Sequence, residues 1–209
     1  MTPAGEPDLR LYLVRHGETA WSLTGQHTGR TDLPLTRHGE DQGLRLAPCL
    51  KNLEFSLVLA SPLARARRTC ELAGLGESAT LDPDLREWDY GEYEGRRSED
   101  ICLRRPGWRI WRDGCPGGES PARVFRRADR LIERLLQRSG NVALFSHGQF
   151  GGVLGARWLG LPGVGGRHFT LGPGSLSILG SDPGHRDTRV IALWNAEAGT
   201  LPAASPGAG

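Results

Sequence analysis

Short apolar runs recur along the chain, and polar residues or glycine follow each of them. Three of these runs are rich in aliphatic side chains: Leu9–Val14, Phe55–Ala60 and Val142–Phe145. Short apolar runs bounded by turn residues are typical of strands that are buried on both faces of a sheet. The pattern therefore predicts three buried strands, with a further short strand near Thr80.

Segments with helix signals separate these strands. In Ser61-Pro62, the proline suits a first helical turn and the serine is predicted to cap it. A second Ser-Pro pair opens a long amphipathic helix over Ser120–Arg138. Its predicted apolar stripe comprises Val124, Ala128, Leu131, Leu135 and Leu136. Two further helices are predicted at Thr36–Leu50 and Phe150–Trp158.

The last part of the chain has a different pattern. Gly174–Gly180 and Arg189–Asn195 are alternating or apolar, and the turn signal Asp182-Pro183-Gly184 lies between them. This arrangement predicts a hairpin that adds an antiparallel edge to the sheet. Strands that alternate with helices before the hairpin predict an α/β fold, a three-layer α/β/α sandwich around a mostly parallel sheet.

Length and composition limit the domain count. The 209 residues, 38% of them hydrophobic and 24% charged, suffice for one sizeable α/β domain. The segments 1–8 and 197–209 are small, polar and rich in Pro and Gly, so we expect flexible tails around a single catalytic domain at 9–196.

Charge and hydropathy argue against nucleic acid and membrane as partners, and the cysteine spacing argues against paired cysteines. The formal net charge is only +2, and the arginines alternate with acidic or apolar residues, which argues against nucleic acid as a partner. Met1–Pro7 does not resemble a signal peptide and no apolar run reaches membrane length, so we expect a cytoplasmic protein without a membrane partner. The four cysteines have no paired spacing and are interpreted as free thiols.

Two histidines directly follow predicted strands. Arg15-His16-Gly17 comes after the first strand, and Ser146-His147-Gly148 comes after the third. Ligands of open α/β sheets bind at the carboxyl ends of the strands, and the helix start after His147 could bind an anion with its backbone amides. Each motif alone is weak, because a histidine after a strand is more often a structural residue.

Further charged groups follow other strands. Arg65 comes from a basic helix start and is the candidate there, although a solvated basic surface explains any single arginine of that helix equally well. The loop Leu85–Gly95 is dense in acids and aromatics, and Glu87 is its candidate acid because aromatic rings beside a carboxyl group exclude water and favour its protonated form. The other acids of the loop are interpreted as turn residues or partners of arginines.

Together these residues favour a phosphate group as the ligand. Arginine binds phosphate oxygens with two parallel hydrogen bonds, and a neutral imidazole can attack phosphorus. No cluster of residues has the spacing of metal ligands, so no metal and no cofactor are expected.

From Leu9 to Asn195 the chain resembles the histidine phosphatase superfamily, the phosphoglycerate-mutase-like enzymes, whose hallmark is the Arg-His-Gly motif. The resemblance implies that His16 is the phosphorylated nucleophile and that Glu87 is the proton donor. It also implies that the phosphate is bound by Arg15, Arg65 and His147.

The same resemblance extends to substrate binding. Thr28 and Gly29 match positions at the substrate phosphate, and Ser22 stands where many members have Asn, which puts a hydroxyl in place of an amide. The other expected substrate-binding residues are Gly17, Trp88, Tyr90 and Gly148.

Three stretches look most like sedoheptulose-bisphosphatase-like sugar phosphatases and actinobacterial acid phosphatases: Thr28–Thr36, Leu85–Gly95 and Trp108–Ser120. The last could form a specificity wall or a surface loop fixed by tryptophan packing. Mutases of the family usually carry an insertion after the acidic loop, where this chain has Arg96–Asp100.

The sequence therefore predicts a metal-independent phosphatase that acts on small phosphorylated metabolites through a phosphohistidine. Phosphoglycerate mutase is the alternative, and a non-catalytic phospho-ligand binder is a remote one, because a binder would need neither His16 nor Glu87. A homodimer is left open.

Overall fold

The computed structural model describes residues 8–198, and its centre is a six-stranded sheet with the strand order β3-β2-β4-β1-β5-β6. The strands are β1 (Arg10–Arg15), β2 (Phe55–Ala60), β3 (Ala79–Leu81), β4 (Asn141–Ser146), β5 (Ser175–Ser181) and β6 (Arg189–Glu197). The first four are parallel, whereas β5 and β6 form the antiparallel hairpin at one edge. The mostly parallel sheet and its antiparallel edge are as predicted.

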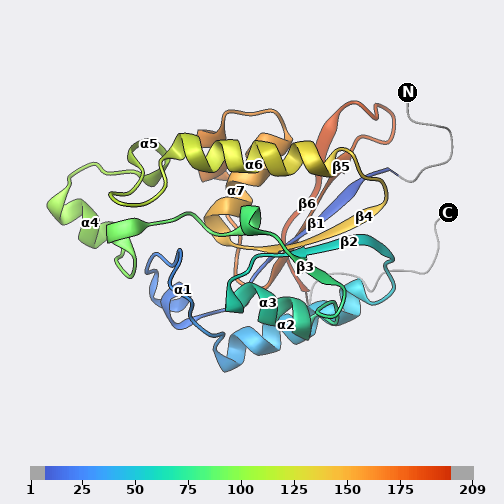
Figure 1. Cartoon of the computed structure of the whole chain (residues 1–209), viewed down its shortest axis with the longest axis horizontal. Coiled ribbons are helices and arrows are strands. Elements are labelled where there is room, and N and C mark those ends of the chain that lie inside the picture. Colours follow the sequence, from blue (N-terminus) through green and yellow to red (C-terminus); the bar gives the residue numbers. More distant parts are fainter. Residues whose placement is uncertain (1–7, 199–209) are drawn as a thin grey trace.

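Helices cover both faces of this sheet (Figure 1). On one face lie α2 (Arg37–Leu50) and α3 (Ala64–Leu72), and on the other lie α6 (Pro121–Leu135) and α7 (Gly148–Trp158). The predicted three-layer sandwich is confirmed.

Side chains of β1 alternate between the two layers of the core. Leu11 and Leu13 belong to the cluster that contains the apolar faces of α6 and α7, whereas Tyr12 and Val14 belong to the cluster on the side of α2 and α3. Successive side chains of a strand point to opposite faces, so a strand packed by helices on both sides must be apolar throughout. This requirement explains the continuous apolar run that identified β1.

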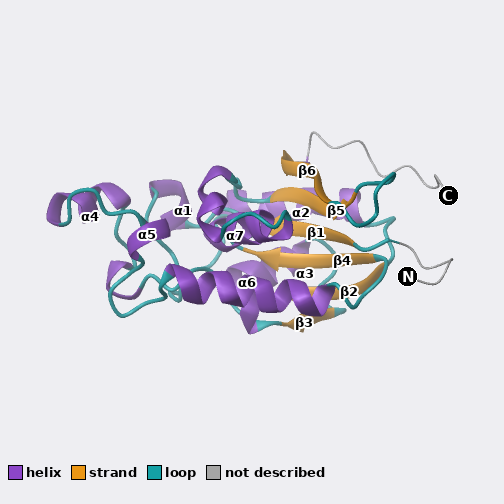
Figure 2. Ribbon diagram, turned by 90° about the horizontal axis from the view of Figure 1, so that it is seen from above, coloured by secondary structure: helices purple, strands orange, loops and turns teal. Residues whose placement is uncertain are grey.

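Short elements gather beyond the carboxyl ends of the parallel strands (Figure 2). They are α1 (Ala20–Thr24), α4 (Ser98–Arg104) and α5 (Ile110–Asp113). Three 3₁₀ turns complete the described elements: η1 (Pro83–Leu85), η2 (Gly91–Tyr93) and η3 (Gly163–His168).

Three local predictions were wrong. Pro62 is not in a first helical turn and Ser61 does not cap the third helix, because that helix begins at Ala64 with Leu63 as its N-cap and no side-chain cap. Leu136 is 47% exposed, because α6 ends at Leu135 and the following residue leaves the apolar stripe. The other four stripe residues are buried as predicted.

The expected tails fall mostly on 1–7 and 199–209, which lie outside the described residues. At the edge of the described part, β6 runs to Glu197 and Ala198 is buried. Within 8–198 no helix is long and apolar enough to cross a membrane. All four cysteines are free.

Candidate active site

His16 lies immediately beyond β1 and is only 4% exposed. Its Nδ1 is 2.7 Å from the carbonyl oxygen of Gly17, which can only accept, so Nδ1 carries the hydrogen. Its Nε2 accepts a 3.3 Å hydrogen bond from Nε of Arg65. The two contacts select the tautomer whose lone pair is on Nε2.

The surroundings keep this imidazole neutral. Burial lowers the pKa of His16 well below its ordinary value, and the charges of Arg65 and Arg15 lower it further. The hydrogen bond to Gly17 opposes this shift but is a smaller effect. A neutral imidazole has the lone pair that a nucleophile needs.

Two arginines flank His16 in different ways. The guanidinium of Arg15 donates from Nη1 to the carbonyl of Leu171, and its Nε is buried without a partner among the described residues. Gly148 lies against this guanidinium, because a Cβ at that position would be 3.2 Å from Cζ of Arg15. Arg15 therefore has hydrogen-bonding capacity left for an anion.

Arg65 is fully buried, and backbone carbonyls hold its terminal nitrogens. Nη1 donates to Thr31 (2.9 Å), and Nη2 donates to Thr28 (3.0 Å) and Gly29 (2.9 Å). The carboxylate of Glu94 in turn accepts from the backbone N–H groups of 29–31, which fixes this loop. Arg65 thus presents only its Nε edge to His16.

Glu87 is 9% exposed, and backbone amides of α7 hold its carboxyl group. Oε1 accepts from the N–H groups of Phe150 (2.8 Å) and Trp88 (3.0 Å), and Oε2 accepts from Gln149 (3.0 Å). Each carboxyl oxygen can accept two hydrogen bonds, so Oε2 keeps one site for a proton. The first turn of α7, where we expected an anion, binds this side chain of the protein itself.

His147 is fully buried at the carboxyl end of β4, and its ring centroid is 5.1 Å from that of His16. Its Nε2 lies 2.8 Å from Oγ of Ser61. That oxygen accepts from the N–H of Leu63, and its hydroxyl can also donate to Nε2, an arrangement in which the ring hydrogen is on Nδ1. Nδ1 has no partner among the described residues, and burial together with the charge of Arg65 lowers the pKa of His147 well below its ordinary value.

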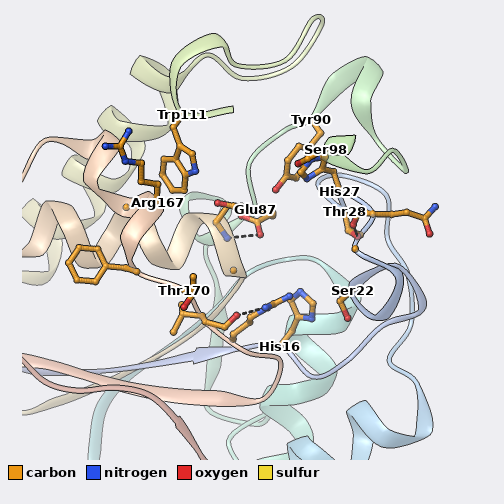
Figure 3. A pocket seen from close by; sticks show the side chains of 18 residues that line it. His16, Ser22, His27, Thr28, Glu87, Tyr90, Ser98, Trp111, Arg167 and Thr170 are labelled. Carbon is orange, nitrogen blue, oxygen red and sulfur yellow. Dashed lines mark hydrogen bonds between the residues drawn. The ribbon is translucent and has the colours of Figure 1, made fainter. Parts of the chain in front are cut away.

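A cavity of about 420 Å³ opens over these groups (Figure 3). Of the predicted site residues, seven line it: Arg15, His16, Ser22, Thr28, Glu87, Tyr90 and Gly148. The hydroxyl of Ser22 is engaged with the backbone of Thr19, and the ring of Tyr90 stacks on His27 with centroids 4.5 Å apart.

Five predicted residues are not among those that line the cavity. Arg65 and His147 lie against His16, as described above. Gly17 and Gly29 have their N–H groups engaged by Thr69 and Glu94. Trp88 was wrongly predicted to contact substrate: it is fully buried, and its Nε1 donates to the carbonyl of Glu119.

The sequence did not reveal several groups that the fold brings to the site. Ser61 was interpreted as a helix cap, although it contacts His147. His27, Ser98, Arg167 and Thr170 line the cavity but belong to no motif that could have identified them. In the segment Trp108–Ser120, Trp108 is packed with its Nε1 on the carbonyl of Gly114, whereas Trp111 reaches the cavity, so the segment both packs and forms a wall.

Within residues 8–198, no group of three or more His, Cys, Asp or Glu side chains is arranged to hold a metal ion. Arginine side chains supply positive charge at this site: Arg15 and Arg65 beside His16, and Arg167 in the lining of the cavity.

Several known proteins are similar to this chain over most of its length. An acid phosphatase of Mycobacterium tuberculosis is 40% identical over 188 residues, which cover 88% of this chain and 92% of that protein. A sedoheptulose 1,7-bisphosphatase of Saccharomyces cerevisiae is 37% identical, with 73% and 68% covered. A probable phosphoglycerate mutase GpmB of Erwinia tasmaniensis is 35% identical, with 81% and 83% covered.

A solved structure of a Mycobacterium tuberculosis protein has a TM-score of 0.84 at 39% identity, with 90% of this chain and 98% of that chain covered. The family model described as "Histidine phosphatase superfamily (branch 1)" matches residues 11–196. This chain belongs to the histidine phosphatase superfamily, branch 1.

Proposed function

We propose that this protein is a phosphatase that hydrolyses phosphomonoesters of small phosphorylated metabolites through a phosphohistidine at His16. One observation supports the proposal above all others: Nδ1 of His16 donates to Gly17, so Nε2 carries the lone pair, and this nitrogen lies 3.3 Å from Nε of Arg65. The relatives named acid phosphatase and sedoheptulose bisphosphatase support the same reaction class.

In the first step, Nε2 of His16 attacks phosphorus and the bond from phosphorus to the ester oxygen breaks. Arg15 neutralises the phosphoryl oxygens with its free Nε, Arg65 exchanges its long contact with His16 for one of these oxygens, and His147 donates from Nδ1. The proton on Oε2 of Glu87 goes to the leaving alkoxide, so the product leaves as an alcohol.

In the second step, the Glu87 carboxylate takes a proton from a water molecule that attacks the phosphohistidine. The bond between nitrogen and phosphorus breaks, inorganic phosphate leaves, and His16 and protonated Glu87 are restored. One carboxyl group thus acts first as acid and then as base. Side chains supply all the positive charge in this scheme, so neither a metal ion nor a cofactor takes part in any step.

We expect a pH optimum on the acidic side of neutral. The first step consumes a proton at the leaving oxygen. The lowered pKa of His16 keeps its imidazole neutral at pH values where an ordinary histidine is charged.

For the substrate, we propose a sugar phosphate or bisphosphate, or another small ester of the kind an acid phosphatase accepts. The cavity volume of about 420 Å³ is within the range of small-molecule sites. Arg167 lies at its rim beside Trp111 (Figure 3), and within the described part of the chain no carboxylate pairs with it. An unpaired cation at the rim favours substrates with a second negative charge.

Phosphoglycerate mutase is the second candidate, because relatives named as probable mutases match most of the chain. A mutase returns a phosphorylated isomer, whereas a phosphatase releases inorganic phosphate. The segment Arg96–Asp100, which stands where mutases usually carry an insertion, favours the phosphatase. A non-catalytic binder is disfavoured, because His16 and Glu87 both line the cavity.

The working environment follows from the same proposal. We propose that the protein acts in the cytoplasm on a diffusible metabolite, as a monomer or a homodimer. Sedimentation velocity of the purified protein distinguishes the two assemblies.

Rapid quenching with ³²P-labelled substrate tests the proposed function. The wild-type protein should form an acid-labile phosphoprotein and release inorganic phosphate, and a chelator should leave both unchanged. His16→Ala should lose both, whereas His185→Ala changes an exposed histidine and should keep both. An alkali-labile acyl phosphate, or phosphoprotein that persists in His16→Ala, would contradict the proposal.

A further inference from the structure

Arg127 of α6 is a buried arginine that the proposed chemistry does not use. Its side chain is 9% exposed and forms an ion pair with Glu119, which is 13% exposed. The pair is bidentate, since Nε donates to Oε1 (3.1 Å) and Nη2 donates to Oε2 (2.9 Å). Removing an arginine from water in this way is costly unless its remaining donors also find acceptors.

The remaining donors of Arg127 are directed at the loop that carries Glu87. Nη1 donates to the carbonyls of Asp84 (2.8 Å) and Arg86 (2.6 Å), and Nη2 donates to the carbonyl of Glu87 itself (3.3 Å). A guanidinium has five N–H donors, and every one of them has an acceptor here. Arg127 therefore fixes the backbone on which the Glu87 side chain stands.

Glu119 fixes the other end of the same loop. Its Oε2 accepts from the N–H of Asp89 (3.1 Å), its carbonyl accepts from Nε1 of Trp88 (3.0 Å), and its own N–H donates to the carbonyl of Asp89 (2.9 Å). The ion pair thus holds the residues before and after Glu87.

Arg127 also contacts the helix that receives the Glu87 carboxyl group. Its Cζ lies 4.4 Å from the ring centroid of Phe150, within the range of a cation–π contact. The N–H of that same Phe150 donates to Oε1 of Glu87. One guanidinium therefore sets the position of the loop relative to the amides that orient the carboxyl group.

We propose that Arg127, paired with Glu119, is a positioning residue for the proton transfer at Glu87. This inference rests on the proposed function. Arg127 contacts neither substrate nor the reacting atoms, and it does not line the cavity above His16. It acts by keeping Oε2 of Glu87 at one place, where the proton can reach the leaving oxygen.

This role makes a prediction that a merely structural role does not make. A poor leaving group, such as an alkoxide, needs the proton of Glu87, whereas a nitrophenolate leaves without it. For a two-step phosphohistidine mechanism, kcat/KM reports only on steps up to release of the alcohol. A misplaced Glu87 should therefore lower kcat/KM for alkyl phosphates and spare that for aryl phosphates.

The test compares glycerol 3-phosphate with p-nitrophenyl phosphate. In Arg127→Lys and Glu119→Gln, kcat/KM should fall about tenfold or more for the alkyl ester and stay within about twofold for the aryl ester, because small misplacements of a catalytic group are costly. Glu87→Gln should show the same selectivity more strongly. Arg126→Lys, an exposed change on the same helix, should alter neither rate.

Thermal unfolding of each variant separates positioning from folding. Equal losses on both esters, or unchanged rates on both in Arg127→Lys, would overturn the inference even if the melting temperature falls. If Glu87→Gln loses more kcat/KM for the alkyl ester than for the aryl ester and the Arg127 and Glu119 variants do not, the positioning role of Arg127 is wrong and the proposed function stands. If Glu87→Gln shows no selectivity, the proposed role of Glu87 and the inference that rests on it both fail.

Discussion

At the scale of single residues, the site depends on which hydrogen-bonding groups are already engaged. Arg65 has given its terminal nitrogens to backbone carbonyls, whereas Arg15 keeps a buried Nε without a partner among the described residues. The two arginines are therefore not equivalent. Arg65 is held in place and directs only its Nε at His16, whereas Arg15 can still donate a hydrogen bond to an anion.

Arg167 has a separate effect that substrate choice can reveal. Its one hydrogen bond within the described residues runs from Nε to Nε2 of His168, and its terminal nitrogens are exposed at the rim. Arg167→Gln should lower kcat/KM about tenfold for 3-phosphoglycerate and leave glycerol 3-phosphate within about twofold, since the carboxylate is the difference between them.

Arg138→Gln provides the matched control for that comparison, because it removes the same charge after the far end of α6, outside the cavity above His16. Steady-state phosphate release gives the two kcat/KM values, one for each ester, that are needed for each variant. Equal losses on both esters in Arg167→Gln would mean that Arg167 raises the local potential without recognising a second anion.

At the scale of elements, the loop after β1 passes very close to α2. A Cβ on Gly17 would lie 2.2 Å from the carbonyl oxygen of Gly39, an atom of helix backbone that cannot move aside cheaply. The N–H of Gly17 also donates to Oγ1 of Thr69 in α3, at 3.0 Å. Gly17 therefore joins the end of β1 to the two helices of one layer.

Gly17→Ala should destabilise the protein by about 1–3 kcal/mol, the usual cost of forcing extra atoms into a packed site. It should also lower activity, because the carbonyl that orients His16 belongs to the same residue. Urea unfolding measures the first effect and phosphate release the second. Gly74→Ala is not a suitable control because its φ is +82°, but Gly165→Ala has only side-chain atoms at 3.9 Å and should be tolerated.

The helices and strands could be predicted where buried apolar positions recur at a regular spacing along the chain. The continuous apolar run of β1 and the stripe of α6 are visible in the sequence because each needs a neighbour on its apolar side. His16 and His147 could be named because each directly follows an apolar run, and Glu87 could be named because it lies in a loop dense in acids and aromatics. The contacts between them could not, because they depend on how distant elements meet.

Two residues show this limit in physical terms. Ser61 before a proline has the local pattern of a helix cap, and only the approach of β4 to β2 brings His147 to its hydroxyl. Trp88 follows Glu87 directly, yet the two side chains diverge: Glu87 turns to the amides of α7, and Trp88 packs edge-on against Trp111 and Phe125. Sequence spacing does not determine such directions.

At the scale of the whole molecule, function and stability make opposite demands on pH. The layers bury two histidines beside arginines, and both histidines have a pKa well below the ordinary value, chiefly through burial and then through Arg65. Between pH 6.5 and these lower pKa values, each histidine binds a proton in the unfolded chain but not in the folded one. The free energy of unfolding must therefore decrease as the pH falls through this window.

Within that window, each histidine adds as much as about 1.4 kcal/mol per pH unit to the slope of the free energy of unfolding against pH. Above pH 6.5 the histidine is neutral in both states and adds nothing to the slope. His147→Gln removes one of the two groups, so its free energy of unfolding should depend less steeply on pH between 7 and 5 than that of the wild type. Urea unfolding at several pH values measures the slope, and His185→Gln, at an exposed position, should keep the wild-type slope. A wild-type slope in His147→Gln would mean that His147 titrates alike in both states. The expected slope sets an acid limit to the working range, because the fold loses stability as the pH falls toward the acidic optimum that we propose.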